Sequence, residues 1–354
     1  MADKKLMKGN EALAEAAIMA GCRHYFGYPI TPQTEVAAYM AKRMPKIGGT
    51  FLQAESEIAA INMVIGAAAA GKRAMTSSSS PGISLKSEGI SYMAGCDLPG
   101  LIVNVQRGGP GLGGIQPSQS DYFQATRGGG HGDYHLLVLA PNSVQEMADM
   151  VFRGFDLAEK YRIPCMLLAD GTLGQMMEPV SLEAAEVEAH DKSWALTGTK
   201  GLRQPNIINS LALQPQELEK WNDDRYERYR QIEENEPISE SYLMEDAEIC
   251  VVAFGIASRV SQNAVDMARA KGIKAGMIRP VTLWPFPKKA LYEASKQCSA
   301  FVDVELNKGQ MIEDVELAIR CSRPVCFCGR TGGMIPSPDE VLAAIEEAQK
   351  EGRA

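Results

Sequence analysis

Residues 51–82 read FLQAESEIAAINMVIGAAAAGKRAMTSSSSPG, and this stretch decides the fold class. An apolar run ending near residue 54 precedes an alanine-rich segment with helical periodicity, and a second apolar run, RAMTSS, follows it. Short apolar runs bounded by turn residues favour buried strands, while the longer periodic segment favours a helix. The stretch therefore predicts a strand, a helix and a second strand.

The same alternation extends in both directions from this unit. Further strand candidates in the first 180 residues are HYFGYP (24–29), LIVNVQ (101–106), HLLVLAP (135–141) and CMLLAD (165–170). Helix-like stretches such as EALAEAAIMAG lie between them, and this alternation is typical of a parallel sheet covered on both faces.

The alternation stops over residues 190–245 and resumes from residue 246. The interruption contains QPQELEKWNDDRYERYRQIEENEP, which is charged and poor in aliphatic residues, as expected of an exposed helical arm. We therefore expect an α/β protein with two doubly wound parallel-sheet domains, over 1–185 and 246–354, joined by a charged linking arm over 186–245.

Composition and charge argue against nucleic-acid-binding, membrane-spanning and secreted classes of protein. The 354 residues have a net charge of −8 and contain no run rich in Lys and Arg, so we expect no nucleic-acid partner. No apolar stretch reaches the roughly 20 residues that a membrane span needs. The first residues, MADKKLMKGNEALAEAA, lack the apolar core of a signal peptide, so the expected location is the cytoplasm.

The eight cysteines do not form the pattern of a disulfide framework. Most lie in apolar runs, which is typical of reduced core cysteines. One cluster, CSRPVCFCG, contains Cys321, Cys326 and Cys328 and leaves open a partial metal site. Neither a second pair nor a C-x-x-C run accompanies it, so we assign no metal ligand.

Two carboxylates open the alanine-rich helix. At 100° per residue, Glu57 falls on the apolar face beside Ala60 and Val64, whereas Glu55 falls on the other side. Glu57 is either an exposed first-turn acid favoured by the helix dipole or a buried carboxyl able to exchange a proton near neutrality. Spacing alone leaves both interpretations open.

A second candidate is Arg107, which ends the predicted strand LIVNVQ and precedes the glycines of GGPGLGG. Ligands of open α/β sheets bind beyond the carboxyl ends of strands, so Arg107 is positioned to pair with a carboxylate. A surface salt bridge is the alternative. The glycines are also a weak phosphate-loop signal, but they match no Walker pattern.

The segment FGYPITPQTEV (26–36) holds two prolines three positions apart. Residues before proline are restricted to extended backbone, which applies to Tyr28 and Thr31. We predict a helix with Thr31 as its N-cap and Pro32 at its first position, so that a stiff loop presents a hydroxyl and an anion-binding helix end.

Two other loops carry polar groups. The run TSSSSPG (76–82) includes Ser78 and either lines a site or forms an ordinary turn. His131, in the glycine-rich loop 126–135, is either an acid–base group or an unremarkable loop residue, and the sequence leaves its role open.

Taken together, GYPITPQTEV, QAESEIAAINMVIGAAAAGKRAMTSSSSPGISL and the stretch VQRGGPGLGG…QSDYFQATRGGGHGDY resemble one family. It is the alpha subunits of 2-oxoacid:ferredoxin oxidoreductases, enzymes that use thiamin diphosphate, and the resemblance is greatest to the 2-oxoisovalerate (3-methyl-2-oxobutanoate) branch. The resemblance spans nearly the whole chain. It implies a pyrimidine-type thiamin-diphosphate domain followed by a transketolase C-terminal-like domain.

The resemblance also implies roles for individual residues. Glu57 corresponds to the glutamate that exchanges a proton with the aminopyrimidine ring, which would overturn the exposed-acid interpretation. Thr31 and Arg107 correspond to the groups that bind the 2-oxoacid. The remaining residues implied to contact the cofactor are Tyr28, Pro29, Ile30 and Ser78.

Some features that a complete site needs are missing. The diphosphate and Mg²⁺ normally require a Gly-Asp-Gly motif with a later asparagine, but Asp170-Gly171 lacks the first glycine and no asparagine follows before Asn206. Cysteine sets for iron–sulfur clusters are also missing. We therefore expect a beta subunit to supply the diphosphate site and Mg²⁺, and iron–sulfur subunits to pass electrons to ferredoxin, with coenzyme A accepting the acyl group.

The neutral stretch after Arg107 offers no obvious cation for a second substrate carboxylate, which favours a branched aliphatic oxoacid over 2-oxoglutarate. An inward-pointing Lys72, Arg73 or Lys86 would weaken this inference. The alternatives are a 2-oxoglutarate or pyruvate enzyme, a subunit that keeps only the fold, and an independent nucleotide-binding protein.

Overall fold

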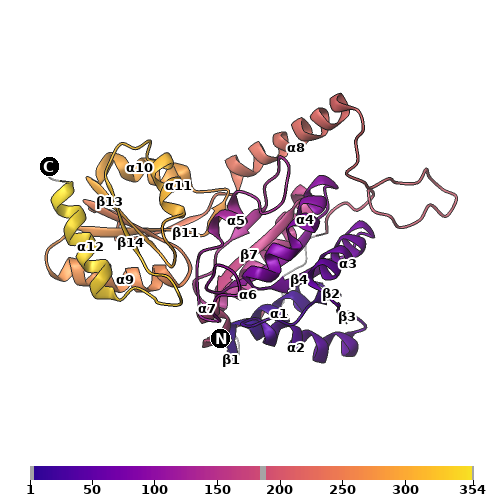
Figure 1. Cartoon of the computed structure of the whole chain (residues 1–354), viewed down its shortest axis with the longest axis horizontal. Helices are drawn as coiled ribbons and strands as arrows, with labels where there is room; N and C mark the ends of the chain where they lie inside the picture. Colours follow the sequence, from indigo (N-terminus) through magenta and orange to yellow (C-terminus); the bar gives the residue numbers. More distant parts are fainter. Residues whose placement is uncertain (1–3, 184–188, 353–354) are drawn as a thin grey trace.

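The computed structural model describes residues 4–183 and 189–352, so the expected boundary between residues 185 and 186 lies outside the described residues. Two α/β units lie side by side, and a long arm extends from the first unit (Figure 1). Within the described ranges, no helix is long and apolar enough to cross a membrane.

The first unit is built on a seven-stranded sheet with the order β12-β6-β7-β5-β4-β2-β3. Its strands are β2 (His24–Gly27), β3 (Thr50–Gln53), β4 (Ala74–Ser78), β5 (Gly100–Gln106), β6 (Leu137–Leu139), β7 (Pro164–Asp170) and β12 (Thr282–Trp284). All neighbours pair in parallel except β12, and β4, β5, β6 and β7 are buried throughout. The expected parallel sheet and its strands are confirmed.

Helices cover both faces of this sheet. They are α1 (Gly9–Met19), α2 (Thr34–Arg43), the 3₁₀ turn η1 (Met44–Ile47), α3 (Glu57–Ala69), α4 (Ser80–Gly95), α5 (Tyr122–Thr126), α6 (Val144–Tyr161) and α7 (Gly171–Gln175). Helices α3 and α4 pack together, and α1 packs against α2 and α6. Right-handed crossovers place these two groups on opposite faces.

The adjacent strands β2 and β4 therefore lead to helices on opposite faces. β2 continues into α2, which lies on the face of α1, whereas β4 continues into α4 on the face of α3. This is a topological switch point, and the crevice at the carboxyl ends of two such strands is where open α/β sheets bind ligands.

The second unit has a five-stranded sheet with the order β14-β13-β10-β11-β9. Its strands are β9 (Ser239–Tyr242), β10 (Ile249–Ala253), β11 (Ala275–Pro280), β13 (Ala300–Glu305) and β14 (Val325–Gly329). Its helices are α9 (Gly255–Ala270), α10 (Lys288–Gln297), α11 (Met311–Ala318) and α12 (Pro338–Glu351). A separate two-stranded antiparallel sheet pairs β1 (Lys5–Lys8) with β8 (Met177–Val180) and was not expected from the sequence.

Two strands differ from the sequence interpretation. The run KAGMIRPVTLW (274–284) reads in the sequence as one apolar strand of the second unit, but it divides at Pro280, and β12 pairs antiparallel with β6 of the first sheet. Pro280 has no N–H with which to continue the ladder, and Trp284 gains a stacking contact with His135 at 4.6 Å between ring centroids. Strand β9, within the range expected to be arm, pairs antiparallel with β11 because its polar SESY run suits a sheet edge.

The helix expected in the charged arm is α8 (Pro215–Asn235). Most of its side chains are exposed, and its buried residues, Arg225, Tyr229 and Ile232, recur at helical spacing. Tyr229 packs edge-on against Trp284 and His135, so α8 lies against the place where β12 joins the first sheet. Glu233 of α8 also pairs with Lys288 of α10 in the second unit at 3.1 Å, so the arm contacts both units.

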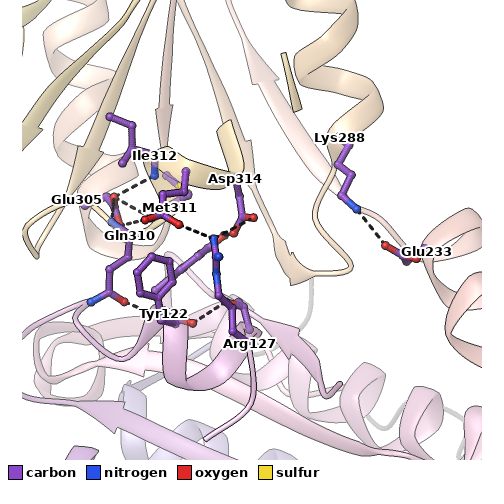
Figure 2. A network of polar contacts seen from close by, with 12 residues as sticks. Tyr122, Arg127, Glu233, Lys288, Glu305, Gln310, Met311, Ile312 and Asp314 are labelled. Carbon is purple, nitrogen blue, oxygen red and sulfur yellow. Dashed lines mark hydrogen bonds and ion pairs between the residues drawn. The ribbon is translucent and has the colours of Figure 1, made fainter. Parts of the chain in front are cut away.

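A buried hydrogen-bond network joins the two units (Figure 2). Glu305, at the end of β13, accepts hydrogen bonds from the backbone N–H groups of Gln310 (2.8 Å) and Met311 (2.9 Å). The Gln310 side chain in turn accepts from the Phe123 N–H at 2.8 Å, and the Tyr122 hydroxyl donates to Asp314 at 2.7 Å. The start of α5 is therefore fixed by the second unit.

Asp170 ends β7 and caps α7. Its Oδ1 accepts hydrogen bonds from the N–H groups of Thr172 (2.8 Å) and Leu173 (3.1 Å), so the carboxylate that sequence analysis left without a metal role has a structural one. Burial raises the pKa of Asp170 from 3.8 to about 6.

Replacing Asp170 with Asn should abolish one component of the pH dependence of stability. Because the folded pKa lies above the unfolded value, the native state holds the proton more tightly, and Asp170 lowers stability as pH rises from about 4 through 6. Asn keeps the capping oxygen without the charge. The unfolding free energy of Asp170→Asn should equal that of the wild type at pH 4 and exceed it at pH 8 by up to about 3 kcal/mol in denaturant titrations. Equal values at both pH values would contradict this assignment.

Candidate functional site

The site residues that the sequence predicted lie together at the switch point, although they belong to four different elements of the fold. Tyr28–Thr31 follow β2, Ser78 is the last residue of β4, Arg107 directly follows β5, and Glu57 is the first residue of α3. Carboxyl ends of parallel strands meet at one edge of the sheet, which explains why segments 80 residues apart converge.

Glu57 is buried, with 6% of its surface exposed, on the same helix face as Ala60 and Val64. Ser56 caps the helix, since its hydroxyl accepts a hydrogen bond from the Ala59 N–H at 3.2 Å. Glu55, two residues earlier, is exposed. The burial alternative for Glu57 is therefore the correct one, and the exposed-acid alternative is wrong.

Ser78 and Gly82 adjoin the Glu57 carboxylate. The Ser78 hydroxyl is buried and has no hydrogen-bond partner among the described residues. A Cβ atom on Gly82 would clash with this hydroxyl and lie 2.7 Å from Glu57 Oε1. The missing side chain of Gly82 thus leaves a cradle between a carboxylate and an unsatisfied hydroxyl, which suits the ring nitrogen and amino group of an aminopyrimidine.

Lys86, on α4, also points toward Glu57. The residue is fully buried, and its Nζ donates to the backbone carbonyl of Glu57 at 3.4 Å. Sequence analysis named Lys86 only as a cation that would weaken the substrate inference if it pointed inward, and it does. Lys72 is exposed, whereas Arg73 pairs with Asp156 and Glu159 on α6.

The loop after β2 rests on a buried polar network. The Ser77 hydroxyl donates to Gln33 Oε1 at 2.5 Å and lies 2.7 Å from the Tyr25 hydroxyl, and Gln33 Nε2 donates to the Tyr28 carbonyl at 3.4 Å. The sequence alone did not point to these supporting residues. The one hint in the sequence is Gln33, a polar residue that directly follows Pro32. Only the fold shows that Gln33 is buried.

The predicted N-cap at Thr31 and helix start at Pro32 are wrong. Helix α2 begins at Thr34 with Gln33 as its N-cap, and no side chain caps it. Residues 30–33 instead form a turn in which the Ile30 carbonyl accepts from the Gln33 N–H at 3.2 Å. Thr31 is exposed in this turn, and Tyr28 has 36% of its surface exposed. The helix end therefore offers no anion site at Thr31, although the hydroxyl remains free to face a ligand.

The Arg107 side chain contacts the backbone of Thr31. Its guanidinium donates to the Thr31 carbonyl at 3.0 Å and to the Leu112 carbonyl at 3.2 Å, and only 7% of the residue is exposed. The Nε atom is buried without a partner, and no acidic side chain among the described residues forms an ion pair with it. The surface salt-bridge alternative is therefore wrong, and the cation keeps unused N–H groups.

Hydrogen bonds with Ser80 hold the backbone of Arg107 in place. Its N–H donates to Ser80 Oγ at 3.0 Å, and Ser80 Oγ donates to Asp121 Oδ2 at 2.6 Å. Asn104 also donates to Asp121, at 2.8 Å. Burial raises the pKa of Asp121, and these hydrogen bonds oppose that rise.

Two cavities flank the Arg107 loop. One of about 480 Å³ is lined by Thr31, Ile115 and Thr172, among others. The other, of about 900 Å³, lies between the units and is lined by the start of α4, the loop 108–111 and Lys308.

The other groups raised by the sequence lie elsewhere. His131 is exposed, lines a separate cavity with Trp221 and Arg225 of α8, and does not approach Glu57. In the parts of the chain that the structure describes, no three His, Cys, Asp or Glu side chains form a group able to hold a metal, and Cys326 contacts Glu351 at 3.3 Å.

Two family models together match most of the chain. Residues 15–242 match the model of the thiamine-diphosphate-binding domain of pyruvate flavodoxin/ferredoxin oxidoreductases, and residues 247–341 match that of pyruvate:ferredoxin oxidoreductase core domain II. The chain is 50% identical over 344 residues to ketoisovalerate oxidoreductase subunit VorB of Methanothermobacter marburgensis, covering 97% of each chain. It is 38% identical to 2-oxoglutarate synthase subunit KorA of Methanothermobacter thermautotrophicus, covering 98% of this chain and 99% of that one.

Solved structures show the same architecture. The 2-oxoglutarate:ferredoxin oxidoreductase of Magnetococcus marinus, solved with 2-oxoglutarate, coenzyme A and succinyl-CoA bound, superimposes with a TM-score of 0.88 at 29% identity. The match covers 98% of this chain and 65% of that one. A split-gene transketolase shares the fold alone, with a TM-score of 0.62 at 14% identity over 98% of this chain and 99% of that one. The chain therefore belongs to the family of thiamine-diphosphate-binding 2-oxoacid:ferredoxin oxidoreductase subunits.

Proposed function

We propose that this chain supplies the pyrimidine side of a thiamin-diphosphate site that oxidatively decarboxylates 2-oxoisovalerate to its acyl-CoA and CO₂ while reducing ferredoxin. The observation that carries the proposal is the buried Glu57 carboxylate beside the unsatisfied Ser78 hydroxyl and the cradle at Gly82. The 50% identity to a ketoisovalerate oxidoreductase subunit supports this substrate.

The residues fit the cofactor. Thiamin diphosphate, when bound, supplies a carbon nucleophile that attacks the keto group and holds the electrons released when CO₂ leaves. Glu57 would hold or release a proton at the ring nitrogen, Ser78 would meet a ring donor or acceptor, and Tyr28, Pro29 and Ile30 would cover the ring. Burial of Glu57 keeps water from competing for that proton.

Thr31 and Arg107 would bind the substrate. The Thr31 hydroxyl donates to a substrate oxygen, and the unused Arg107 N–H groups pair with the carboxylate next to the keto group. Their shared hydrogen bond fixes their spacing before the substrate arrives, which lowers the entropy cost of orienting it.

A branched aliphatic substrate fits the surrounding charges better than 2-oxoglutarate. Lys86 points inward and brings a cation close to the site, which weakens this preference, whereas Arg73 is paired with Glu159 on α6. Lys308 is exposed at the cavity between the units and favours the alternative of a 2-oxoglutarate enzyme, which the identity to 2-oxoglutarate synthase subunits also supports. Turnover of the complete complex with 2-oxoisovalerate, pyruvate and 2-oxoglutarate distinguishes these substrates.

Partner subunits complete the proposed site. Tyr28 and Thr31 are exposed in this chain although a thiamin site excludes water, so another subunit would cover them. That beta subunit would bring the diphosphate site and Mg²⁺, and iron–sulfur subunits would pass electrons to ferredoxin. We place the complex in the cytoplasm.

Thiamin diphosphate should bind tightly only when the chain is paired with its beta subunit. Calorimetric titration with thiamin diphosphate and Mg²⁺ tests this on the lone chain and on the pair. Tight Mg²⁺-dependent binding by the lone chain would show that it owns the whole site.

Glu57→Gln should lower turnover of the complex about 100-fold or more, because the amide cannot exchange the proton. Glu55→Gln is the matched control, since Glu55 is exposed two residues earlier and should leave turnover unchanged. Wild-type turnover in the Glu57→Gln complex would instead support a subunit that keeps the fold only.

Arg107→Met should raise the KM for 2-oxoisovalerate about 10- to 100-fold, the value of one or two charge-assisted hydrogen bonds. Affinity for thiamin diphosphate should stay at the wild-type value. Arg127→Met serves as a control, because Arg127 pairs with Glu313 between the units. A KM unchanged by Arg107→Met would remove this residue from the substrate site.

A further inference from the structure

We propose that residues 202–213 of the linking arm, here called the arm segment, form a docking surface for a second copy of this chain. The arm leaves the fold at the edge opposite the candidate site. The Leu196 N–H donates to the Ala69 carbonyl at 2.8 Å, at the end of α3, whereas Glu57 opens that helix. Because the 13 residues of α3 span about 20 Å, a contact that covers the candidate site is distinct from one that covers the arm segment.

The arm segment exposes four large aliphatic side chains. Leu202 is 86% exposed, Ile207 83%, Leu211 68% and Leu213 79%. The arm extends beyond α3 and α4, on the side away from the second unit (Figure 1). Single exposed leucines are ordinary, but several on one short segment mark an interaction site, because their hydration is unfavourable.

The arm segment has an inner and an outer face. Side chains of an extended chain alternate between two faces, so residues 207, 211 and 213 share one of them. Ile208, on the other face, is partly buried and packs against the core. Among the described residues, 203–213 form no backbone–backbone hydrogen bond. The outer face therefore offers a partner both a row of aliphatic side chains and unpaired backbone groups.

Charge favours a second copy of this chain as the partner. Lys200 and Arg203 are exposed, and neither forms an ion pair within the described part of the chain. Helix α8, which follows the arm segment directly, exposes Glu217, Glu219 and Asp223, and these also form no ion pair with any described residue. The chain as a whole has a net charge of −8, so it complements its own cationic arm.

A two-fold axis would use this complementarity twice. In a symmetric dimer, residue i of one copy contacts residue j of the other, and j contacts i. The arm segment and α8 are consecutive in the chain, so an axis between them sets each arm segment against the α8 of the other copy. The cations of each arm then meet the acids of the partner copy, and both aliphatic rows leave water.

Sedimentation velocity of the full-length chain tests the docking surface. The wild type should sediment with the mass of two chains at micromolar concentration. Leu211→Ser/Leu213→Ser should raise the dissociation constant about 100-fold or more, because four leucines of each dimer lose their buried contacts. Leu317→Ser is the matched control, since Leu317 is 67% exposed on α11 of the second unit, and it should leave the dimer intact.

Charge reversal tests which surface the arm segment meets. Lys200→Glu and Glu219→Lys should each weaken the dimer about 10-fold, because each places like charges opposite one another. Mixing these two variants should give a mixed dimer that is tighter than the dimer of either variant alone. In the mixed dimer, each reversed charge faces its complement on the other copy.

A monomeric wild-type chain would overturn the inference, as would a dimer that Leu211→Ser/Leu213→Ser leaves intact. A mixed dimer no tighter than those of the single variants would remove α8 as the surface that the arm segment meets. If the wild-type chain is monomeric and the leucine variant loses affinity for the proposed beta subunit, the arm segment docks that subunit and not a second copy. None of these results depends on thiamin diphosphate, so the proposed function is tested separately.

Discussion

Every residue of the candidate site depends on one topological constraint, the reversal between the neighbouring strands β2 and β4. Because β2 leads to α2 on one face and β4 to α4 on the other, their carboxyl ends form a switch point, and the crevice at such a point is where open α/β sheets bind ligands. The loop 28–31 enters the crevice from one side and Ser78 from the other. The connection from β3 back to β4 passes through α3, which places Glu57 at the same edge.

The site keeps polar groups that a core built only for stability would lack. Lys86, Glu57 and Ser78 are buried with few hydrogen bonds, whereas Gln33, Ser77 and Tyr25 form a compact network directly beneath them. The contrast has a physical reason: supporting groups are satisfied so that the loop is rigid, and groups that meet a ligand keep unused donors and acceptors.

The second unit contributes to the site without supplying its main chemical groups. Gln119 donates to the Phe254 carbonyl at 2.8 Å and accepts from the Leu306 N–H at 3.0 Å, so the segment that follows the Arg107 loop is fastened to the second unit. Asp121, two residues later, holds Ser80 and thereby the Arg107 backbone (Figure 2 shows the neighbouring contacts of Tyr122 and Gln310). The position of Arg107, the proposed substrate-binding cation, is therefore set partly by contacts between the units.

The sequence by itself determined the alternation of strands and helices, the apolar face that carries Glu57 and the convergence of strand ends, because these follow from local periodicity and parallel pairing. It placed the start of α2 two residues early, since Thr31-Pro32 has the local signal of a cap but the turn at Ile30 takes precedence. It also assigned β12 to the second unit, because strand partners depend on contacts far apart in the chain. Only the tertiary structure decided which polar residues are buried: Glu57 rather than Glu55, and Lys86 beside it, because burial depends on what packs over a helix face and not on the residues within it.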